Sequence, residues 1–263
     1  MDYYHSKICA FFTVASFVLI SLTLNLHALK PNFVKLYENR YNPQKKSIDI
    51  NKLPPSNSSL HFLLATIGRK TIFRMLDSLE PQLKSQDYLT IVFDAQDDDN
   101  VLDKVKFRTS TYPCTVNRIY EEKNLGFWGH GIRNKYQELP GDFILHCDDD
   151  NFYTENSISV IRKICTDKTK FYSFRVGSIP PYTDKDGSPS SETYNQPIQD
   201  LEKIFRPMDT GAGVIPSAYN KLTTWEYFYG GDKAFYKKLY DLIDPNKIVL
   251  VGYTHYYLVK QPI

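Results

Sequence analysis

Apolar and polar positions alternate in blocks along the middle of the chain, and the blocks have two different periods. Four runs have the length and pattern of strands: residues 60–67, 88–94, 115–122 and 142–147. Three further stretches have the apolar spacing of one helix face: residues 70–79, 134–139 and 154–165. Strands that alternate with helices predict an α/β fold, with a mostly parallel central sheet covered by helices on both sides.

The alternation of strands and helices ends after about residue 176. Residues 178–197, SIPPYTDKDGSPSSETYNQP, are polar throughout and predict a long loop that could act as a lid. Residues 248–259 predict one more strand. We therefore expect one domain over residues 60–263, with a regular half at 60–176 and a less regular half at 177–263.

The N-terminal segment from Ile8 to Leu26 is apolar and carries no charge. A helix of this length crosses a hydrocarbon core of roughly 30 Å, so we expect a signal anchor over residues 8–29, after a short tail at 1–7. A cleaved signal peptide and a buried core helix are the alternatives. Lysines flank the segment on both sides, so the orientation stays open.

Residues 30–59 are polar with scattered prolines, which is typical of a stem between a membrane and a domain. Asn57-Ser58-Ser59 is an N-glycosylation sequon in this stem, which makes Asn57 a candidate glycosylation site. Together with the anchor, these features predict a single-pass type II membrane protein of the Golgi or another endomembrane.

Charge and cysteine content exclude some classes of function. The net charge of +2 gives no basis for a nucleic-acid partner. The 4 cysteines contain no CxxC metal motif and no disulfide framework, and only Cys114 and Cys165 are a plausible pair. With 42% hydrophobic and 24% charged residues, the composition is that of a globular protein with a core.

The strand predicted at 142–147 runs into three consecutive aspartates in FILHCDDDNFY (143–153). Ionised carboxylates at this spacing repel one another, and a hard divalent cation offsets that cost. Alternate residues of an extended segment point the same way, so Asp148 and Asp150 share a face and can hold Mg²⁺ or Mn²⁺, and through it a diphosphate. Ligands of such sheets bind at the carboxyl ends of the strands.

The alternative is that DDDN only caps the next helix and is solvated. The same tetrapeptide occurs at 97–100, before VLDKV, where helix capping is a sufficient explanation. The run at 148–151 follows the stronger apolar strand, which favours the metal site there.

Four segments, in their order and spacing, resemble a glycosyltransferase of the GT-A fold, similar to family 2, over about residues 60–259. They are LLATIGR (63–69), VFDAQ (92–96), NLGFWGHGIRNKY (124–136) and HCDDDN (146–151). In that family these segments surround the nucleotide-sugar. The resemblance implies contacts with the donor from Thr66, Arg69, Asp94, Gly126, Arg133, Asn134, Asp148 and Asp149.

The resemblance also assigns particular roles. Asp148 would contact the ribose or the metal, and Asp150 would bind the metal. Arg133 would reach the diphosphate with its planar guanidinium group, with a surface salt bridge as the alternative. His255, in GYTHYYLV, matches a late histidine that completes the metal site of some relatives, although packing in a Tyr-rich strand is the alternative. His130 would lie near the donor or end a loop.

Downstream, WEYFYGGD (225–232) resembles the Trp…Gly-Gly-Glu-Asp segment on the acceptor side of such enzymes. The resemblance implies that Asp232 is the general base for the acceptor hydroxyl, with Glu226 as the second candidate base and helix capping by Asp232 as the alternative. Asp209 and Gly211, in DTGAG, would border the acceptor pocket. The expected acceptor contacts, with the Trp ring as a sugar-stacking surface, are Trp225, Glu226, Gly230 and Gly231.

We therefore expect a hexosyltransferase-like enzyme with Mn²⁺ or Mg²⁺ as cofactor. It would move a sugar, with inversion, from a nucleoside-diphosphate sugar, UDP-linked rather than GDP-linked, to a hydroxyl of a glycan, glycoprotein or glycolipid. Two alternatives stay open. A nucleotidyltransferase on a related α/β scaffold would attack phosphorus and release pyrophosphate, and an inert membrane protein would bind sugars or nucleotides without turnover.

Overall fold

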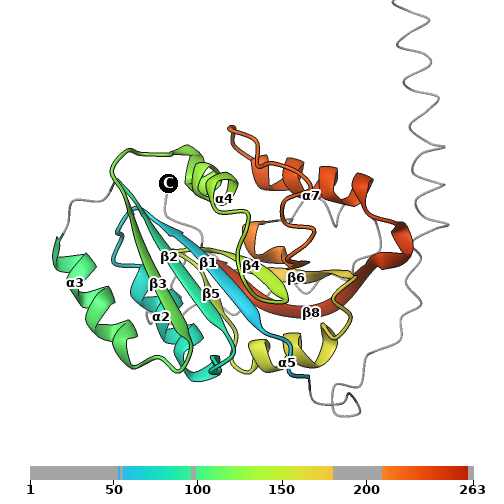
Figure 1. Ribbon diagram of the computed structural model, residues 1–263, viewed down its shortest axis with the longest axis horizontal. Helices are drawn as coiled ribbons and strands as arrows, with labels where there is room; N and C mark the ends of the chain where they lie inside the picture. Colours follow the sequence, from blue (N-terminus) through green and yellow to red (C-terminus); the bar gives the residue numbers. More distant parts are fainter. Residues whose placement is uncertain (1–52, 54–55, 96–98, 180–208, 260–263) are drawn as a thin grey trace, which may run out of the picture. The chain divides into compact units, whose positions relative to one another are not determined.

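The described part of the chain is built on one sheet of 8 strands, shown in Figure 1, the computed structural model of the protein. The structure describes residues 53, 56–95, 99–179 and 209–259. The predicted anchor, most of the predicted stem and nearly all of the predicted loop at 178–197 lie outside these residues. Within the described residues, no helix has both the length and the apolar composition needed to cross a bilayer.

Strands and helices alternate in the first part of the chain, as the sequence predicts. The strands are β1 (Leu60–Thr66), β2 (Tyr88–Asp94), β3 (Thr115–Glu121), β4 (Phe143–Asp148), β5 (Phe152–Tyr153), β6 (Phe171–Ile179), β7 (Gly213–Pro216) and β8 (Ile248–Val259). The α-helices are α2 (Ile72–Leu79), α3 (Asp99–Arg108), α4 (His130–Lys135), α5 (Ser157–Ile164) and α7 (Gly231–Leu242).

The strand order in the sheet is β3-β2-β1-β4-β7-β6-β8-β5. β1 is parallel to both of its neighbours, β2 and β4, and β2 is parallel to β3, so these four strands end at the same edge. β7 is antiparallel to β4 and β6, β6 is parallel to β8, and β5 is antiparallel to β8. The predicted mostly parallel sheet is therefore confirmed, with a mixed second half.

Helices cover both faces of the sheet, because alternate residues of a strand point to opposite sides. On β1, Leu60 and Phe62 pack in a core with α2, α3 and α5, while Leu63 and Ala65 pack with Ile132 of α4. Helix α7 packs on β6 and β7 through a separate aromatic cluster. In Figure 1, α4 and α7 lie together on one side of the sheet and α2 and α5 on the other.

A buried ion pair ties the start of β1 to α5 and to the turn before β2. The fully buried Asp87 carboxylate pairs with the guanidinium group of Arg162, which is also buried. The same carboxylate accepts hydrogen bonds from the backbone N–H groups of Leu60 (3.1 Å) and Lys84 (2.8 Å). Arg162 Nη1 donates to the Ser58 carbonyl at 2.8 Å, so the pair has hydrogen-bond partners on both sides.

The predicted strands match β1 to β4 within one residue at each end. The helix predicted at 134–139 is wrong in position, since α4 runs from His130 to Lys135. Gly129, with φ 83°, turns the chain into this helix, and Tyr136 leaves helical geometry. A helix of 6 residues is too short to show a repeating apolar face, so periodicity has nothing to detect.

Strands β5, β6 and β7 are missing from the predicted elements. β7 has only the 4 residues GVIP, and β5 has 2, so neither shows an alternating pattern. β5 and β7 therefore depend on their neighbours in the sheet rather than on their own sequence. The disulfide considered between Cys114 and Cys165 is absent as well, because both thiols are free and buried.

Candidate active site

The carboxyl ends of β1, β2 and β4 open into one cleft of about 860 Å³. Because these strands are parallel and adjacent, the residues that end them meet at the same edge. The cleft is lined on the sheet side by Thr66, Arg69, Asp94, Asp148, Asp149 and Asp150, and on the far side by Asp209, Thr210, Tyr229, Gly230 and Asp232. Most of the predicted donor residues and the predicted base therefore share one cavity.

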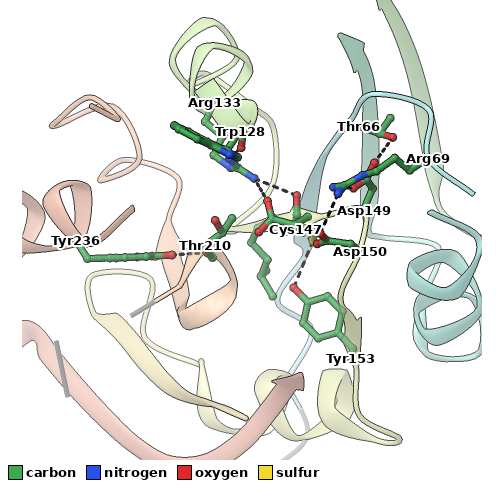
Figure 2. Close-up of polar contacts among 12 residues, drawn as sticks. Thr66, Arg69, Trp128, Arg133, Cys147, Asp149, Asp150, Tyr153, Thr210 and Tyr236 are labelled. Atoms are coloured by element: carbon green, nitrogen blue, oxygen red, sulfur yellow. Dashed lines mark hydrogen bonds and ion pairs between the residues drawn. The ribbon is translucent and has the colours of Figure 1, made fainter. Parts of the chain in front are cut away.

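Asp149 has the most buried side chain of the three consecutive aspartates. Its side chain is buried, and its two oxygens accept a hydrogen bond from Thr66 Oγ1 at 2.6 Å and pair with Arg69. Thr66 Oγ1 in turn accepts a hydrogen bond from the Gly68 N–H at 2.9 Å. Figure 2 shows Thr66 and Arg69 together on the opposite side of the aspartates from Arg133. Asp149 therefore fixes the end of β1 against the turn after β4.

Asp148 ends β4 and pairs with Arg133 of α4. The Arg133 guanidinium group is fully buried and also donates to two carbonyl oxygens, those of Trp128 at 2.9 Å and Cys147 at 3.3 Å (Figure 2). The alternative of a surface salt bridge is wrong, since Arg133 has no exposed side-chain area. Its role as a diphosphate ligand stays a prediction, and its present partners show that it positions Asp148.

Asp150 contacts two arginines, Arg69 and Arg74. Its carboxylate lies 3.1 Å from Arg69 Nη1, and its backbone carbonyl accepts a hydrogen bond from Arg74. Burial raises the pKa of Asp150, and the negative charge of Asp148 raises it further, while Arg69 opposes both effects. Like-charge repulsion of the kind expected from the sequence is therefore present at this site.

The described residues hold no ready-made cage of metal ligands, so a divalent cation would have to be bound by the cleft carboxylates together with a ligand. Among the described residues, no three His, Cys, Asp or Glu side chains gather at the spacing of metal ligands. His255 lies on β8, and its side chain is outside the described residues. Mg²⁺ and Mn²⁺ in nucleotide sites are usually held by one or two carboxylates together with phosphates. Asp148 and Asp150, both facing the cleft, supply that donor set.

Asp94 holds the loop that follows β3. Its carboxylate oxygens accept hydrogen bonds from the backbone N–H groups of Leu125 at 2.5 Å and Gly126 at 2.9 Å. The carboxylate lines the cleft, and the predicted contact with the nucleotide base stays a prediction. The structure thus assigns Asp94 one further task, which is to place the residues after Asn124 at the cleft.

The loop held by Asp94 continues through four consecutive residues with positive φ. The φ angles are 68° at Gly126, 55° at Phe127, 54° at Trp128 and 83° at Gly129. For a residue with a side chain, this left-handed geometry costs roughly 1–2 kcal/mol, and two such residues here are aromatic. Strain of this kind is concentrated at binding sites, where the surrounding structure holds it in place.

Asn134 is placed differently from its predicted donor contact. Its amide forms a reciprocal pair with the backbone of Trp225: Nδ2 donates to the carbonyl at 2.8 Å, and Oδ1 accepts from the N–H at 2.7 Å. His130, from the same helix, donates from Nδ1 to the Glu226 carbonyl at 2.7 Å. These residues join α4 to the segment before α7, and so connect the two walls of the cleft.

Trp225 is a core residue in this structure and does not offer a ring face to a sugar, which corrects the predicted stacking role. The ring is 2% exposed, stacks on Phe235 with 4.3 Å between centroids, and has the Arg133 guanidinium group over it at 5.0 Å. Glu226 pairs with Lys238 at the surface and does not line the cleft, so its predicted acceptor contact and its standing as second candidate base lose support.

Gly230 and Gly231 place Asp232 at the cleft. Gly230 lines the cleft with φ 87°, and Gly231 begins α7. A Cβ atom on Gly231 would lie 2.2 Å from the Glu226 carbonyl oxygen, so only glycine fits there. Asp232 is then in the first turn of α7, where its carboxylate oxygen accepts a hydrogen bond from the Lys233 N–H at 2.7 Å.

Two carboxylic acids on this wall of the cleft have altered pKa values. Burial raises the pKa of Asp232, and the negative charge of Asp148 adds to the rise. The pKa of Asp209 is raised well above its usual range by burial, and by the negative charges of Asp148 and Asp232. A carboxyl group in such surroundings is a stronger base than a solvated one, as a proton-accepting residue requires.

Three aromatic residues of the cleft, Phe127, Trp128 and Tyr229, were not among the predicted site residues. The only sequence signal for them is their place beside glycines, in GFWG and YFYGG, where a turn can expose a large ring. Asp209 was predicted to border the acceptor pocket, and it does line the cleft.

No known protein family matches the sequence, and no curated protein matches it either. Solved structures do resemble it. The 1–349 fragment of S. aureus TarS is 15% identical, with a TM-score of 0.58, and the match covers 76% of this chain and 60% of that one. The same fragment has been solved with UDP and with UDP-GlcNAc.

Two further structures match to a similar degree. The mannosyltransferase PcManGT from Pyrobaculum calidifontis, solved with GDP-Man and Mn²⁺, is 13% identical with a TM-score of 0.58, and the match covers 92% of this chain and 67% of that one. GalNAc-T7, solved with UDP, GalNAc and Mn²⁺, is 13% identical with a TM-score of 0.53, and the match covers 78% of this chain and 44% of that one.

These structures are GT-A glycosyltransferases, so the likeness shows that this chain has the GT-A fold and confirms that part of the prediction. The chain spans about 60% of the TarS fragment. At 13–15% identity the likeness carries the fold alone, and the activity has to be argued from the site.

Proposed function

We propose that this protein is a metal-dependent glycosyltransferase that moves a sugar from a nucleoside-diphosphate sugar to an acceptor hydroxyl. One observation carries the proposal: Asp232 lines the same cleft as Asp148 and Asp150. A nucleotide-sugar held at the aspartates would therefore have a base of raised pKa on its acceptor side. The GT-A fold, and neighbours solved with UDP-GlcNAc and GDP-Man, support this reading.

The proposed reaction is a single displacement with inversion at the anomeric carbon. The acceptor oxygen attacks that carbon and forms the new glycosidic bond, while the bond from the carbon to the diphosphate oxygen breaks and its electron pair leaves with the nucleotide. Asp232 accepts the acceptor's hydroxyl proton. Asp94 and the loop that it holds would bind the nucleotide end, and Arg69 and Arg133 would keep the aspartates oriented toward the diphosphate.

Asp148 and Asp150, with His255 as a further predicted ligand, would hold a divalent cation, which would supply positive charge to offset the charge of the leaving diphosphate. Mn²⁺ is favoured because PcManGT and GalNAc-T7 were both solved with it. The donor is a UDP-sugar or a GDP-sugar, since the neighbours were solved with both kinds of nucleotide.

We further propose a glycan, glycoprotein or glycolipid as acceptor, and membrane attachment through residues 8–29 in the type II orientation. The support for attachment is the uncharged apolar segment, which agrees with a sequon at the exposed Asn57. Protease treatment of sealed microsomes tests this directly: the domain should be protected until detergent is added, and Asn57→Gln should remove one glycan from the protein.

The experiment that tests the activity uses the full chain in detergent, stripped of metal. Release of the nucleoside diphosphate is measured from a panel of UDP- and GDP-sugars, with and without Mn²⁺, for the wild type, Asp150→Ala and Asp232→Asn. Asp241→Asn is the matched control, because Asp241 is exposed on the same helix as Asp232 and, among the described residues, its ion pair is with Lys237. We expect Mn²⁺-dependent turnover of one donor, lost in Asp150→Ala, reduced about 10²–10⁴-fold in Asp232→Asn, and kept in the control.

The alternatives are tested with the same preparation, by adding nucleoside triphosphates with sugar phosphates and by measuring nucleotide binding. A nucleotidyltransferase would release pyrophosphate from a nucleoside triphosphate and a sugar phosphate, and would not need Asp232. An inert binding protein would bind a nucleotide in the presence of Mn²⁺ without turning it over. If no donor binds or reacts, the glycosyltransferase proposal is wrong.

A further inference from the structure

Four aromatic side chains are exposed along the edge of the cleft, and we call them the aromatic rim: Phe127, Trp128, Tyr227 and Tyr229. Their exposed fractions are 48%, 65%, 53% and 86%. They contact one another in pairs across two loops, with ring centroids 4.7 Å apart for Phe127 and Tyr227, and 5.8 Å apart for Trp128 and Tyr229. The loop before α4 and the loop before α7 are therefore joined at the surface by contacts between aromatic rings.

The backbone holds the rim outward. Phe127 and Trp128 both have left-handed φ, between glycines that also have positive φ. Hydrogen bonds keep the strained stretch in place at each end: Asp94 accepts from Gly126, and Arg133 donates to the Trp128 carbonyl. Here a strained backbone holds two aromatic rings at the surface, where they gain nothing from burial. Such strain and such exposed apolar rings are both typical of binding sites, so the rim points to a ligand.

The rim belongs to the cleft rather than to a flat outer surface. Phe127, Trp128 and Tyr229 line the same cavity as Asp232, whereas Trp225 is enclosed in the core. On the same wall, Asp209 Oδ1 has no hydrogen-bond partner among the described residues. Exposed ring faces beside an unpaired carboxyl oxygen match one kind of molecule well: a pyranose, which has an apolar C–H face and hydroxyl groups at its edge.

We propose that the aromatic rim is the acceptor subsite, where Trp128 stacks on a pyranose ring of the acceptor glycan, Tyr229 contacts the edge of that ring, and Asp209 accepts a hydrogen bond from one of its hydroxyl groups. The inference rests on the proposed glycosyltransferase function and names the acceptor's chemistry, a carbohydrate and not a protein or lipid hydroxyl. It also moves the stacking role from Trp225, the residue expected from the sequence, to Trp128.

Trp128 provides its own probe, because the chain has 2 tryptophans and the other is buried. Iodide should quench the fluorescence of the exposed Trp128 and leave that of the buried Trp225 unaffected. The quenched fraction of the tryptophan fluorescence therefore reports on the rim alone. The full chain is titrated with methyl glycosides of glucose, galactose, mannose and N-acetylglucosamine, and with chitotriose. Each is tested alone and with UDP and Mn²⁺. We expect at least one saccharide to protect Trp128 from iodide.

Variants then separate stacking from folding. Trp128→Leu should raise the acceptor KM, or the saccharide dissociation constant, by roughly tenfold, since an aliphatic side chain provides no ring face. Trp128→Phe should restore most of that loss. Phe107→Ala is the matched control, because Phe107 is an 83% exposed ring on α3 that does not line the cleft, and its removal should change neither value.

Three results would overturn the subsite. One is that no saccharide protects Trp128. Another is that UDP with Mn²⁺ protects it fully and saccharides add nothing, which would assign the rim to the donor. The third is that phosphatidylcholine vesicles protect it and saccharides do not, which would make it a membrane contact. Donor turnover in the same preparation separates the proposals: with turnover but no protection by saccharides, the subsite alone is wrong.

Discussion

Asp232 shows how one residue's surroundings set its chemistry. The glycines before it place it at the cleft, and burial together with the negative charge of Asp148 raises its pKa. A base must be unprotonated to accept the acceptor's proton, so the raised pKa moves the acid limb of the rate profile upward from the range of a solvated aspartate.

This gives a pH prediction for the proposed reaction. Below the raised pKa of Asp232, kcat/KM should fall about tenfold for each pH unit, because the fraction of unprotonated Asp232 falls in that proportion. The measurement is the pH profile of the wild type and of Asp232→Asn on the same donor. A variant profile that keeps the same acid limb would show that a different group is the base.

A second prediction concerns Thr66, whose hydroxyl group makes two hydrogen bonds in a buried position. Thr66→Val keeps the shape of the side chain but leaves a buried Asp149 oxygen without its hydroxyl donor, so it should lower the free energy of unfolding by about 1–3 kcal/mol. Thr66→Ser retains the hydroxyl and is the matched control, expected to cost less than about 1 kcal/mol. Urea denaturation measures both, and equal losses would mean that the methyl group matters instead.

At the scale of elements, the strands β1 to β4 of the first half could be predicted, whereas in the second half the predicted strand at 248–259 is confirmed as β8 and β6 and β7 were missed. β1, β2 and β4 are buried between two helical layers, so their sequences are almost wholly apolar, and their ends could be located within a residue. β7 is different: GVIP is a strand only because β4 and β6 lie on either side of it. No pattern within 4 residues carries that information.

The candidate site divides in the same way. The three aspartates could be singled out because they directly follow an apolar strand, and Asp232 was implied by the resemblance of residues 225–232 to the acceptor-side segment of GT-A enzymes. The hydrogen-bond partners that hold the site in place could not be found from the sequence. Asn134 and Trp225 are 91 positions apart, and only the packing of α4 against the segment before α7 makes them a hydrogen-bonded pair. Trp225 was therefore expected at the acceptor, whereas Trp128 takes the exposed position.

The ion pair between Asp87 and Arg162 gives a prediction at this scale, since it joins α5 to β1 and to the turn before β2. Removing either partner leaves a buried charge, so Asp87→Asn and Arg162→Leu should each lower the free energy of unfolding by about 3–5 kcal/mol. In the double variant the losses should be far from additive, because the second change removes the charge that the first left unpaired. Additive losses would show that the two side chains act independently.

For the molecule as a whole, two buried histidines predict sensitivity to acid. Burial lowers the pKa of His146 to about 3, with a contribution from the positive charge of Arg133, and burial lowers the pKa of His61 to about 4. In the unfolded chain both regain a pKa near 6.5. Between about pH 6 and pH 4 the unfolded chain therefore binds two more protons than the folded one, and stability falls as the pH falls.

The expected slope is about 2–3 kcal/mol per pH unit in this window from the two histidines, and their contribution is fully present above pH 6.5. Denaturation curves at pH 7, 6, 5 and 4.5 measure it. His146→Gln should reduce the slope by about 1.4 kcal/mol per pH unit, since glutamine does not titrate. An unchanged slope in the variant would mean that carboxylates alone cause the loss.

The strand order has a consequence for how the protein is made. β6 leaves the ribosome with neither of its sheet neighbours available, because β7 and β8 both follow it in the chain, and β4 has an open edge for the same period. The last of these partners is synthesised about eighty residues later, which takes roughly 4–16 s at common rates of translation. During that interval the nascent chain exposes unpaired apolar strands. Chaperones bind such surfaces, and misassembly begins at them. Slower synthesis through residues 180–247 should therefore lower the yield of folded protein, even though no amino acid has changed.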